Sequence, residues 1–186
     1  MTTITPDEMK SLETLFMSET GTPSILLMEH AAQGVFAAIA RHAPKSARVL
    51  FLCGPGNNGG DGYAAARLWC SGGGQADVWE VTSAVRGDAL TNRTLALLHG
   101  VHVLPSADAV DVAEYAAVVD ALYGTGLNHA IEGDAAILIH RLSDHPQIPV
   151  IAVDIPSGLD GTTGRALGAD VVRAAETVTF HRIKQG

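Results

Sequence analysis

The sequence predicts a layered α/β protein with a mainly parallel sheet, and two observations carry that prediction. From residue 48 onward, short apolar segments alternate with helix-sized segments, as expected for consecutive βαβ units. Apolar residues make up 47% of the 186 residues and charged residues only 17%, so many strands and helices should be buried. The length favours one domain, with or without a terminal extension, rather than two.

Two helices are expected ahead of the alternating part. Thr5 can cap the first one, Pro6 suits its first turn, Glu8 completes a capping box and Gly21 ends the helix. The second, Ser24–His42, is apolar almost all round and should be buried. One apolar stripe is expected on the first helix, formed by Met9, Leu12, Leu15 and Phe16.

Glu29 is the exception within the apolar second helix. A buried carboxylate needs partners, and a structural hydrogen bond is favoured over a chemical role.

The alternating part contains six expected strands and four expected helices. The strands are Val49–Cys53, Asp77–Val81, Val101–Leu104, Ala117–Asp120, Val150–Asp154 and Thr177–Phe180. The helices are Gly62–Ser71, Gly87–His99, Asp108–Tyr115 and Glu132–Leu142. Ligands of parallel sheets bind beyond the carboxyl ends of the strands, so function is expected in the segments that follow the strands.

Composition excludes some classes of partner. The net charge is 12 − 20 = −8, which disfavours general nucleic-acid binding. No signal-peptide pattern and no run of 18 apolar residues occurs, which predicts a soluble, cytoplasmic protein without a membrane partner. The two cysteines, Cys53 and Cys70, lack a CxxC spacing and are expected to be free thiols.

The segment CGPGNNGGDG, residues 53–62, is the first of three candidate site loops. Glycines between a strand and a helix let backbone amides face an anion. Gly54, Gly56 and Gly59 satisfy GxGxxG, and Glu80 ends the next strand where a ribose-binding acid would lie. Asp61 argues against a pyrophosphate at these amides, because its charge would oppose that ligand. Capping of the helix is the structural alternative for Asp61.

Two further strand ends carry aspartates. Asp120 closes one strand in VVDALYGTGLNHA, residues 118–130, where glycines and a threonine precede another helix. Asp154 closes another in VIAVDIPSGLDGTTG, residues 150–164, and is a candidate for site chemistry. Ser157 lacks a G-x-S-x-G elbow and is not interpreted as a nucleophile.

The three loops should place oxygen donors on one rim. The candidates are Asn57, Asn58, Asp61, Asp120, Asp154 and Ser157. Amide, hydroxyl and backbone oxygens with few carboxylates suit a monovalent cation such as potassium better than a hard divalent ion.

These loops, in this order, resemble the YjeF N-terminal domain family, the NAD(P)H-hydrate epimerases. The similarity covers GPGNNGGDGYAAARL, VVDALYGTGL, VDIPSGLDGTTG and RAAETVTFHRIKQG, and GTPSILLMEHAA resembles the paired opening helices of the family. The resemblance implies a Rossmann-like three-layer α/β/α sandwich and an isomerase acting on NADHX and NADPHX, the hydrated forms of NADH and NADPH. It also implies one potassium ion per subunit, a homodimer, and an ADP- or ATP-dependent dehydratase as a fused or separate partner. The family pattern continues past Gly186, so the resemblance predicts either a truncated single domain over residues 1–186 or the front part of a fusion.

Roles for individual residues follow from the same resemblance. Expected substrate contacts are Asn57, Asn58, Gly59, Gly60, Asp61, Gly124, Thr125, Gly126, Leu127, Asn128, His129, Ala130 and Asp154. Expected potassium ligands are Asn58, Asp120 and Ser157. Asp154 is the hypothetical principal acid/base, and Asp61 is expected to serve the ring end or the ribose of the substrate.

Two alternatives stay open at the sequence level. One is an NAD(P)-dependent dehydrogenase that uses the GxGxxG segment and Glu80. The other is a non-catalytic nucleotide-binding domain that supports a dehydratase partner.

Overall fold

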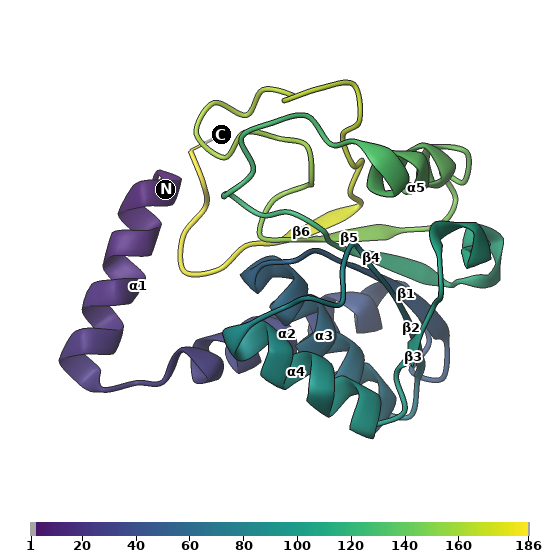
Figure 1. Ribbon diagram of the computed structural model, residues 1–186, viewed down its shortest axis with the longest axis horizontal. Helices are drawn as coiled ribbons and strands as arrows, with labels where there is room; N and C mark the ends of the chain where they lie inside the picture. The colour runs from purple at the N-terminus through teal and green to yellow at the C-terminus, as the bar shows by residue number, and fades with distance from the viewer. Residues whose placement is uncertain (1–2, 186) are drawn as a thin grey trace.

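A computed structural model describes residues 3–185 and contains a six-stranded sheet with helices on both faces (Figure 1). The strands are β1 (Arg48–Cys53), β2 (Gln75–Glu80), β3 (His102–Val103), β4 (Ala117–Ala121), β5 (Val150–Val153) and β6 (Glu176–Val178). The helices are α1 (Pro6–Thr20), α2 (Ser24–His42), α3 (Asn57–Ser71), α4 (Gly87–Leu98) and α5 (Gly133–Ser143), with short 3₁₀ turns η1 (Ala107–Ala109) and η2 (Val112–Glu114).

All paired strands run parallel, in the order β3-β2-β1-β4-β5-β6, which confirms the predicted α/β class. The chain builds the sheet outward from β1 to β3, then returns to the other side of β1 and builds outward from β4 to β6. The direction therefore reverses between β1 and β4. A crevice beyond the carboxyl ends of these two strands is the expected ligand site of such a sheet.

The side chains of the central strands alternate between two cores. Val49 and Phe51 face the layer of α2, α3 and α4, whereas Leu50 and Leu52 face the layer of α5. Figure 1 shows these two layers below and above the sheet. Because both faces are covered, the central strands β1, β4 and β5 are mainly apolar, and they hold their carboxyl ends in fixed positions.

Helix α1 is capped as the sequence predicts. Thr5 Oγ1 accepts a hydrogen bond from the Glu8 backbone N–H at 3.3 Å, and Glu8 Oε2 accepts one from the Thr5 N–H at 2.9 Å. Gly21 ends the helix at φ 68°. Figure 1 shows α1 standing apart from the sheet, at the left. The expected apolar stripe is thus largely exposed, with only Met9 buried.

Two element predictions were wrong. α3 begins at Asn57 instead of Gly62, so the asparagines, the following glycines and Asp61 lie within the helix. The helix expected over Asp108–Tyr115 is instead η1 and η2. There the Asp111 side chain accepts a hydrogen bond from the Ala113 N–H at 3.0 Å, and such local bonds compete with a continuous helix.

Three smaller predictions have clear outcomes. Glu29 is half-buried and forms an ion pair with the side chain of Arg67, a structural partner as expected. Cys53 and Cys70 are free thiols. None of the helices described between residues 3 and 185 has the length and hydrophobicity that a membrane crossing requires.

Candidate active site at the carboxyl ends of the central strands

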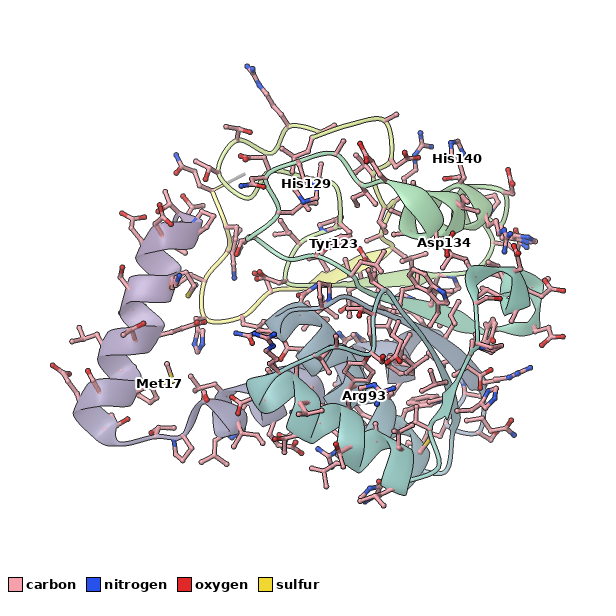
Figure 2. The ribbon with its side chains drawn as sticks, in the orientation of Figure 1. Met17, Arg93, Tyr123, His129, Asp134 and His140 are labelled. Atoms are coloured by element: carbon pink, nitrogen blue, oxygen red, sulfur yellow. The ribbon has the colours of Figure 1, made fainter. Side chains whose placement is uncertain are left out.

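A cavity of about 750 Å³ lies where the segments after β1, β4 and β5 meet the two ends of the chain. Its size falls in the usual range for sites that bind small molecules and cofactors. Figure 2 labels one residue of its α1 side, Met17, and two on the segment after β4, Tyr123 and His129; all three line the cavity.

Most of the residues expected from the sequence lie on the cavity wall. These are Asn57, Asn58, Asp61, Gly124, Thr125, Gly126, Leu127, His129 and Asp154. The other expected residues do not line it: Gly59, Gly60, Asn128, Ala130, Asp120 and Ser157.

Gly59 and Gly60 are buried by close packing at the start of α3. A Cβ on Gly59 would lie 2.0 Å from the carbonyl oxygen of Gly54, and one on Gly60 would lie 2.8 Å from Met28. Gly54 is equally constrained, since its Cβ would lie 1.7 Å from the Leu122 carbonyl oxygen. These glycines let α3 approach the strand ends, which is a structural reason for the GxGxxG pattern.

Asp120 and Ser157 form a buried pair just behind the cavity wall. Ser157 donates to Asp120 through its backbone N–H at 2.8 Å and through Oγ at 2.6 Å, and the Leu122 N–H donates at 3.3 Å. Ser157 Oγ also accepts from the Tyr123 N–H at 2.9 Å. Burial raises the pKa of Asp120 to about 6, although the hydrogen bonds from Ser157 and Leu122 act in the opposite direction.

Asn58 and Asp154 face one another across Gly124. Asn58 Oδ1 and Asp154 Oδ2 each lie 3.1 Å from the point where a Gly124 Cβ would be, so only glycine fits without crowding both side chains. Asp154 itself adopts φ 71°, a left-handed conformation that is uncommon for residues other than glycine. Backbone strain of this kind often accompanies functional positions.

Asp61 is a nearly buried carboxyl group on the cavity wall. Burial raises the pKa of Asp61 well above its usual value, and the charges of Asp154 and Glu13 raise it further. The protonated form of Asp61 is therefore favoured well above the pH at which a free aspartate ionises.

The terminal segments supply cavity residues that the sequence analysis missed. Lys10 and Glu13 of α1 line the cavity, as do His181 and Lys184 near the carboxyl terminus. Lys184 Nζ lies 2.5 Å from Asp154 Oδ1. The only sequence signal for Lys184 was its place in the RIKQG segment, to which no role was assigned.

Glu80, the residue on which the dehydrogenase alternative depends, is occupied by internal contacts. It accepts hydrogen bonds from Tyr63 Oη at 2.6 Å and from Arg93 Nε and Nη2 at 2.7 Å each. These contacts use most of the acceptor capacity of the carboxylate, so little is left for a ribose hydroxyl. This contact disfavours a dinucleotide-dehydrogenase function.

The expected potassium ligands fit an oxygen-liganded cation. Ser157 Oγ donates a hydrogen bond to Asp120 and accepts one from the Tyr123 N–H. The residue after Tyr123 is Gly124, which lies against Asn58 Oδ1. Asn58 Nδ2 is buried and has no hydrogen-bond partner within the described residues. A cation would be bound by the Asp120 carboxylate, the Ser157 hydroxyl oxygen and Asn58 Oδ1, whereas Asn58 Nδ2 is a donor and needs an acceptor instead. Nowhere in residues 3–185 are three or more His, Cys, Asp or Glu side chains grouped to hold a metal ion.

Comparisons with known proteins identify the family and the fold of the chain. The family model for the YjeF-related protein N-terminus matches residues 24–186. A protein of Weissella koreensis named NAD(P)H-hydrate epimerase is 34% identical over 98% of this chain and 82% of its own length. A Leuconostoc mesenteroides protein of the same name is 35% identical over 98% of this chain and 81% of its own length.

Two more relatives extend the comparison. A Moorella thermoacetica protein named bifunctional NAD(P)H-hydrate repair enzyme Nnr is 38% identical over 98% of this chain, which corresponds to 36% of the Moorella protein. The crystal structure of yeast ynu0 (YNL200c) superposes with a TM-score of 0.88 at 22% identity and covers all of this chain and 82% of the yeast chain, so the fold is shared. The chain therefore belongs to the family of the YjeF-related protein N-terminus.

Proposed function

We propose that this protein is an NAD(P)H-hydrate epimerase that interconverts the R and S forms of hydrated NADH and NADPH. The observation that carries the proposal is the convergence of Asp61 and Asp154, from two different elements, on one cavity of about 750 Å³. The names of the relatives support the same activity.

Epimerisation changes the charge at two places, the departing oxygen and the ring nitrogen, and one carboxyl group can serve each. The substrate carries a hydroxyl beside a ring nitrogen, and either that C–O bond or the ring must open and reclose. Asp61, whose raised pKa favours its protonated form, is suited to give a proton to the departing oxygen. Asp154 offers a carboxylate that steadies the iminium-like cation and takes a proton when water returns to the other face. The proton count then balances: Asp61 gives one proton as water leaves, Asp154 takes one as water adds, and that proton passes from Asp154 back to Asp61 through solvent in the cavity before the next turnover.

The rest of the cavity is assigned to binding. Asn57 and Asn58 are proposed to hold the nicotinamide ribose side of the substrate, with Gly59 and Gly60 shaping that wall from behind. The diphosphate is proposed to lie against the amides of the 124–130 segment, where Gly124, Thr125 and Gly126 border the cavity.

A potassium ion is proposed at Asn58, Asp120 and Ser157. When bound it would supply positive charge next to the buried Asp120 carboxylate. The melting temperature tests this site without reference to activity, because an ion that binds only the folded protein raises it. We expect potassium chloride to raise the melting temperature more than lithium chloride at equal ionic strength, and to do so less in an Asn58→Ala variant.

The activity is tested by supplying the pure R hydrate of NADH and following the S hydrate by chromatography. We expect the S form to appear, faster with potassium than without. Asp154→Asn should lower the rate by about 10²–10⁴-fold, the usual contribution of an acid/base group. Asp134→Asn, at an exposed position of α5, is the matched control (Figure 2). Interconversion at the uncatalysed rate would overturn the proposal.

A dehydratase is the proposed partner. An enzyme that removes water from only one epimer would need this isomerase to clear both. The bifunctional name of the Moorella relative supports such a link. The partner is proposed to be ADP- or ATP-dependent, either fused to this chain or separate from it.

A homodimer is proposed from the exposed face of α1. Leu12, Leu15 and Phe16 are 47%, 52% and 44% exposed and lie on one side of the helix. A second copy that covers this face would remove it from water. Sedimentation should give a dimer for the natural chain and a monomer for a Leu12→Glu/Phe16→Glu variant; a monomeric natural chain would contradict this proposal.

A further inference from the structure

Lys184 is the one buried lysine among the three in the chain, and its ammonium group has three partners. Nζ lies 2.5 Å from Asp154 Oδ1 and donates to Thr179 Oγ1 and to the Phe180 carbonyl oxygen, at 3.2 Å each. The contact between Lys184 Nζ and Asp154 Oδ1 is an ion pair. It does not have the angles of a hydrogen bond, and no other described donor bonds to Oδ1. A buried ammonium persists only where such partners compensate for lost water.

The two ends of the chain meet at Lys184. The Ile4 N–H donates to the Ile183 carbonyl at 3.1 Å, and the Gln185 N–H donates to the Ile4 carbonyl at 3.1 Å. These bonds fix the backbone on both sides of Lys184. Ile4 also precedes Thr5, the N-cap of α1, so the same contact anchors α1 beside the cavity.

Asp154 divides its two oxygens between Lys184 and the cavity. Its backbone is held at strand end β5, where the Asp154 N–H donates to the Val178 carbonyl at 2.8 Å. Oδ1 is buried on Lys184, and Oδ2 lies on the side of Gly124 and Asn58. The carboxylate of an aspartate otherwise rotates broadly about its last bond.

We propose that Lys184 is a positioning residue for the epimerisation: it holds Oδ1 of Asp154 so that Oδ2 is presented to the reacting ring. The inference rests on the proposed function and adds Lys184, from the carboxyl-terminal segment, to the residues that take part in it. Lys184 acts through Asp154, and its positive charge also balances that carboxylate within the cavity. Other titratable groups that line this cavity include Asp61 from α3, Lys10 and Glu13 from α1, and His181, whose Nε2 lies 3.5 Å from Glu13 Oε1.

A purely structural role for Lys184 makes different predictions. Loss of a structural ion pair lowers the melting temperature and the fraction of folded protein, but it leaves kcat per folded molecule unchanged. Loss of a positioning residue lowers kcat per folded molecule and leaves KM nearly unchanged, because the substrate is bound by other groups.

The test measures kcat, KM and melting temperature for Lys184→Met, with Lys45→Met, at an exposed position, as the matched control. We expect kcat to fall about 100-fold for Lys184→Met, the typical cost of misplacing a catalytic group, with KM changed less than about threefold. Lys45→Met should behave as the natural protein. Should Lys184→Met fail to fold, Lys184→Arg carries the test: it keeps the charge in a planar group, and a kcat about tenfold lower at similar KM is expected.

Chemical rescue provides a second readout that a structural role would not move. Lys184 lines the cavity, so the space left in Lys184→Ala is open to small solutes. Ethylammonium should raise the kcat of Lys184→Ala at least about tenfold, whereas ethanol at equal concentration should leave it unchanged. A natural protein without epimerase activity overturns both the proposed function and this inference. An active natural protein with unchanged kcat in Lys184→Met, or no rescue by the amine, overturns this inference alone.

Discussion

The cavity has two kinds of wall that are built differently. The wall formed by the segments after β1, β4 and β5 is continuous with the sheet and is joined by buried hydrogen bonds such as Ser157 Oγ to Asp120 at 2.6 Å. The wall formed by α1 and residues 180–185 stands away from the sheet (Figure 1). It is joined by the Ile4 backbone bonds and by the Glu13–His181 contact at 3.5 Å.

The strand-end wall fixes the positions of the two catalytic carboxyl groups, whereas the terminal wall acts on their charges. Asp61 and Asp154 come from the wall that is part of the folded core, so their places are set when the sheet forms. Two further groups that act on their charges come from the terminal wall. Glu13 raises the pKa of Asp61, after burial and Asp154, and Lys184 pairs with Asp154. Changes in the packing of the first wall should therefore affect folding, whereas changes in the second wall should mainly affect the charge of the two carboxyl groups.

The largest effect is expected for Gly59→Ala in the strand-end wall. The new Cβ would lie 2.0 Å from the Gly54 carbonyl oxygen, which is backbone and cannot move aside. We expect the free energy of unfolding to fall by at least about 3 kcal/mol, at the upper end of overpacking effects. Denaturant unfolding of Gly126→Ala is the control, because a Cβ there meets nothing within 4 Å. Equal stability of the two variants would contradict the packing argument.

An intermediate effect is expected from the titration of Asp61. Its pKa is raised in the folded protein, mainly by burial, so the folded state binds this proton more tightly than the unfolded state. The resulting stability is complete below the unfolded value of about 3.9 and is lost as the pH rises through the raised folded value. We expect the free energy of unfolding of the natural protein to decline with rising pH relative to Asp61→Asn.

Denaturant titrations of both proteins across this pH range provide the measurement. Parallel curves would mean that Asp61 has the same proton affinity in both states, and that its role as the proton donor lacks physical support.

The smallest effect is expected for Glu13→Gln in the terminal wall. This change removes one of the charges that raise the pKa of Asp61, so Asp61 should ionise at lower pH. The alkaline limb of the kcat profile should move to lower pH, and kcat at the optimum should change by less than about tenfold, well below the loss of an acid/base group. Glu19→Gln, exposed on the same helix, is the control. Reduced thermal stability without a shifted pH profile would mean that Glu13 stabilises the fold and does not act on the pKa of Asp61.

Local sequence signals predicted the elements whose stability is local. The capping box of Thr5 and Glu8 depends on side chains three residues apart, and it formed as expected. The apolar strands needed only their own composition and the alternation with helices. The start of α3 was predicted too late, because the glycines of residues 59–62 disfavour a helix locally. Close packing against the strand ends overrides that preference.

The order of strands and helices, and the presence of carboxylates at the strand ends, could be read from the sequence, because each depends on neighbouring residues and on the rules of parallel sheets. Tertiary structure alone decided which of those carboxylates lies buried, which meets Lys184 and which is held by Ser157. Such differences depend on contacts between residues far apart in the chain, such as Ile4 with the Lys184 segment, and on the loss of water around each charge.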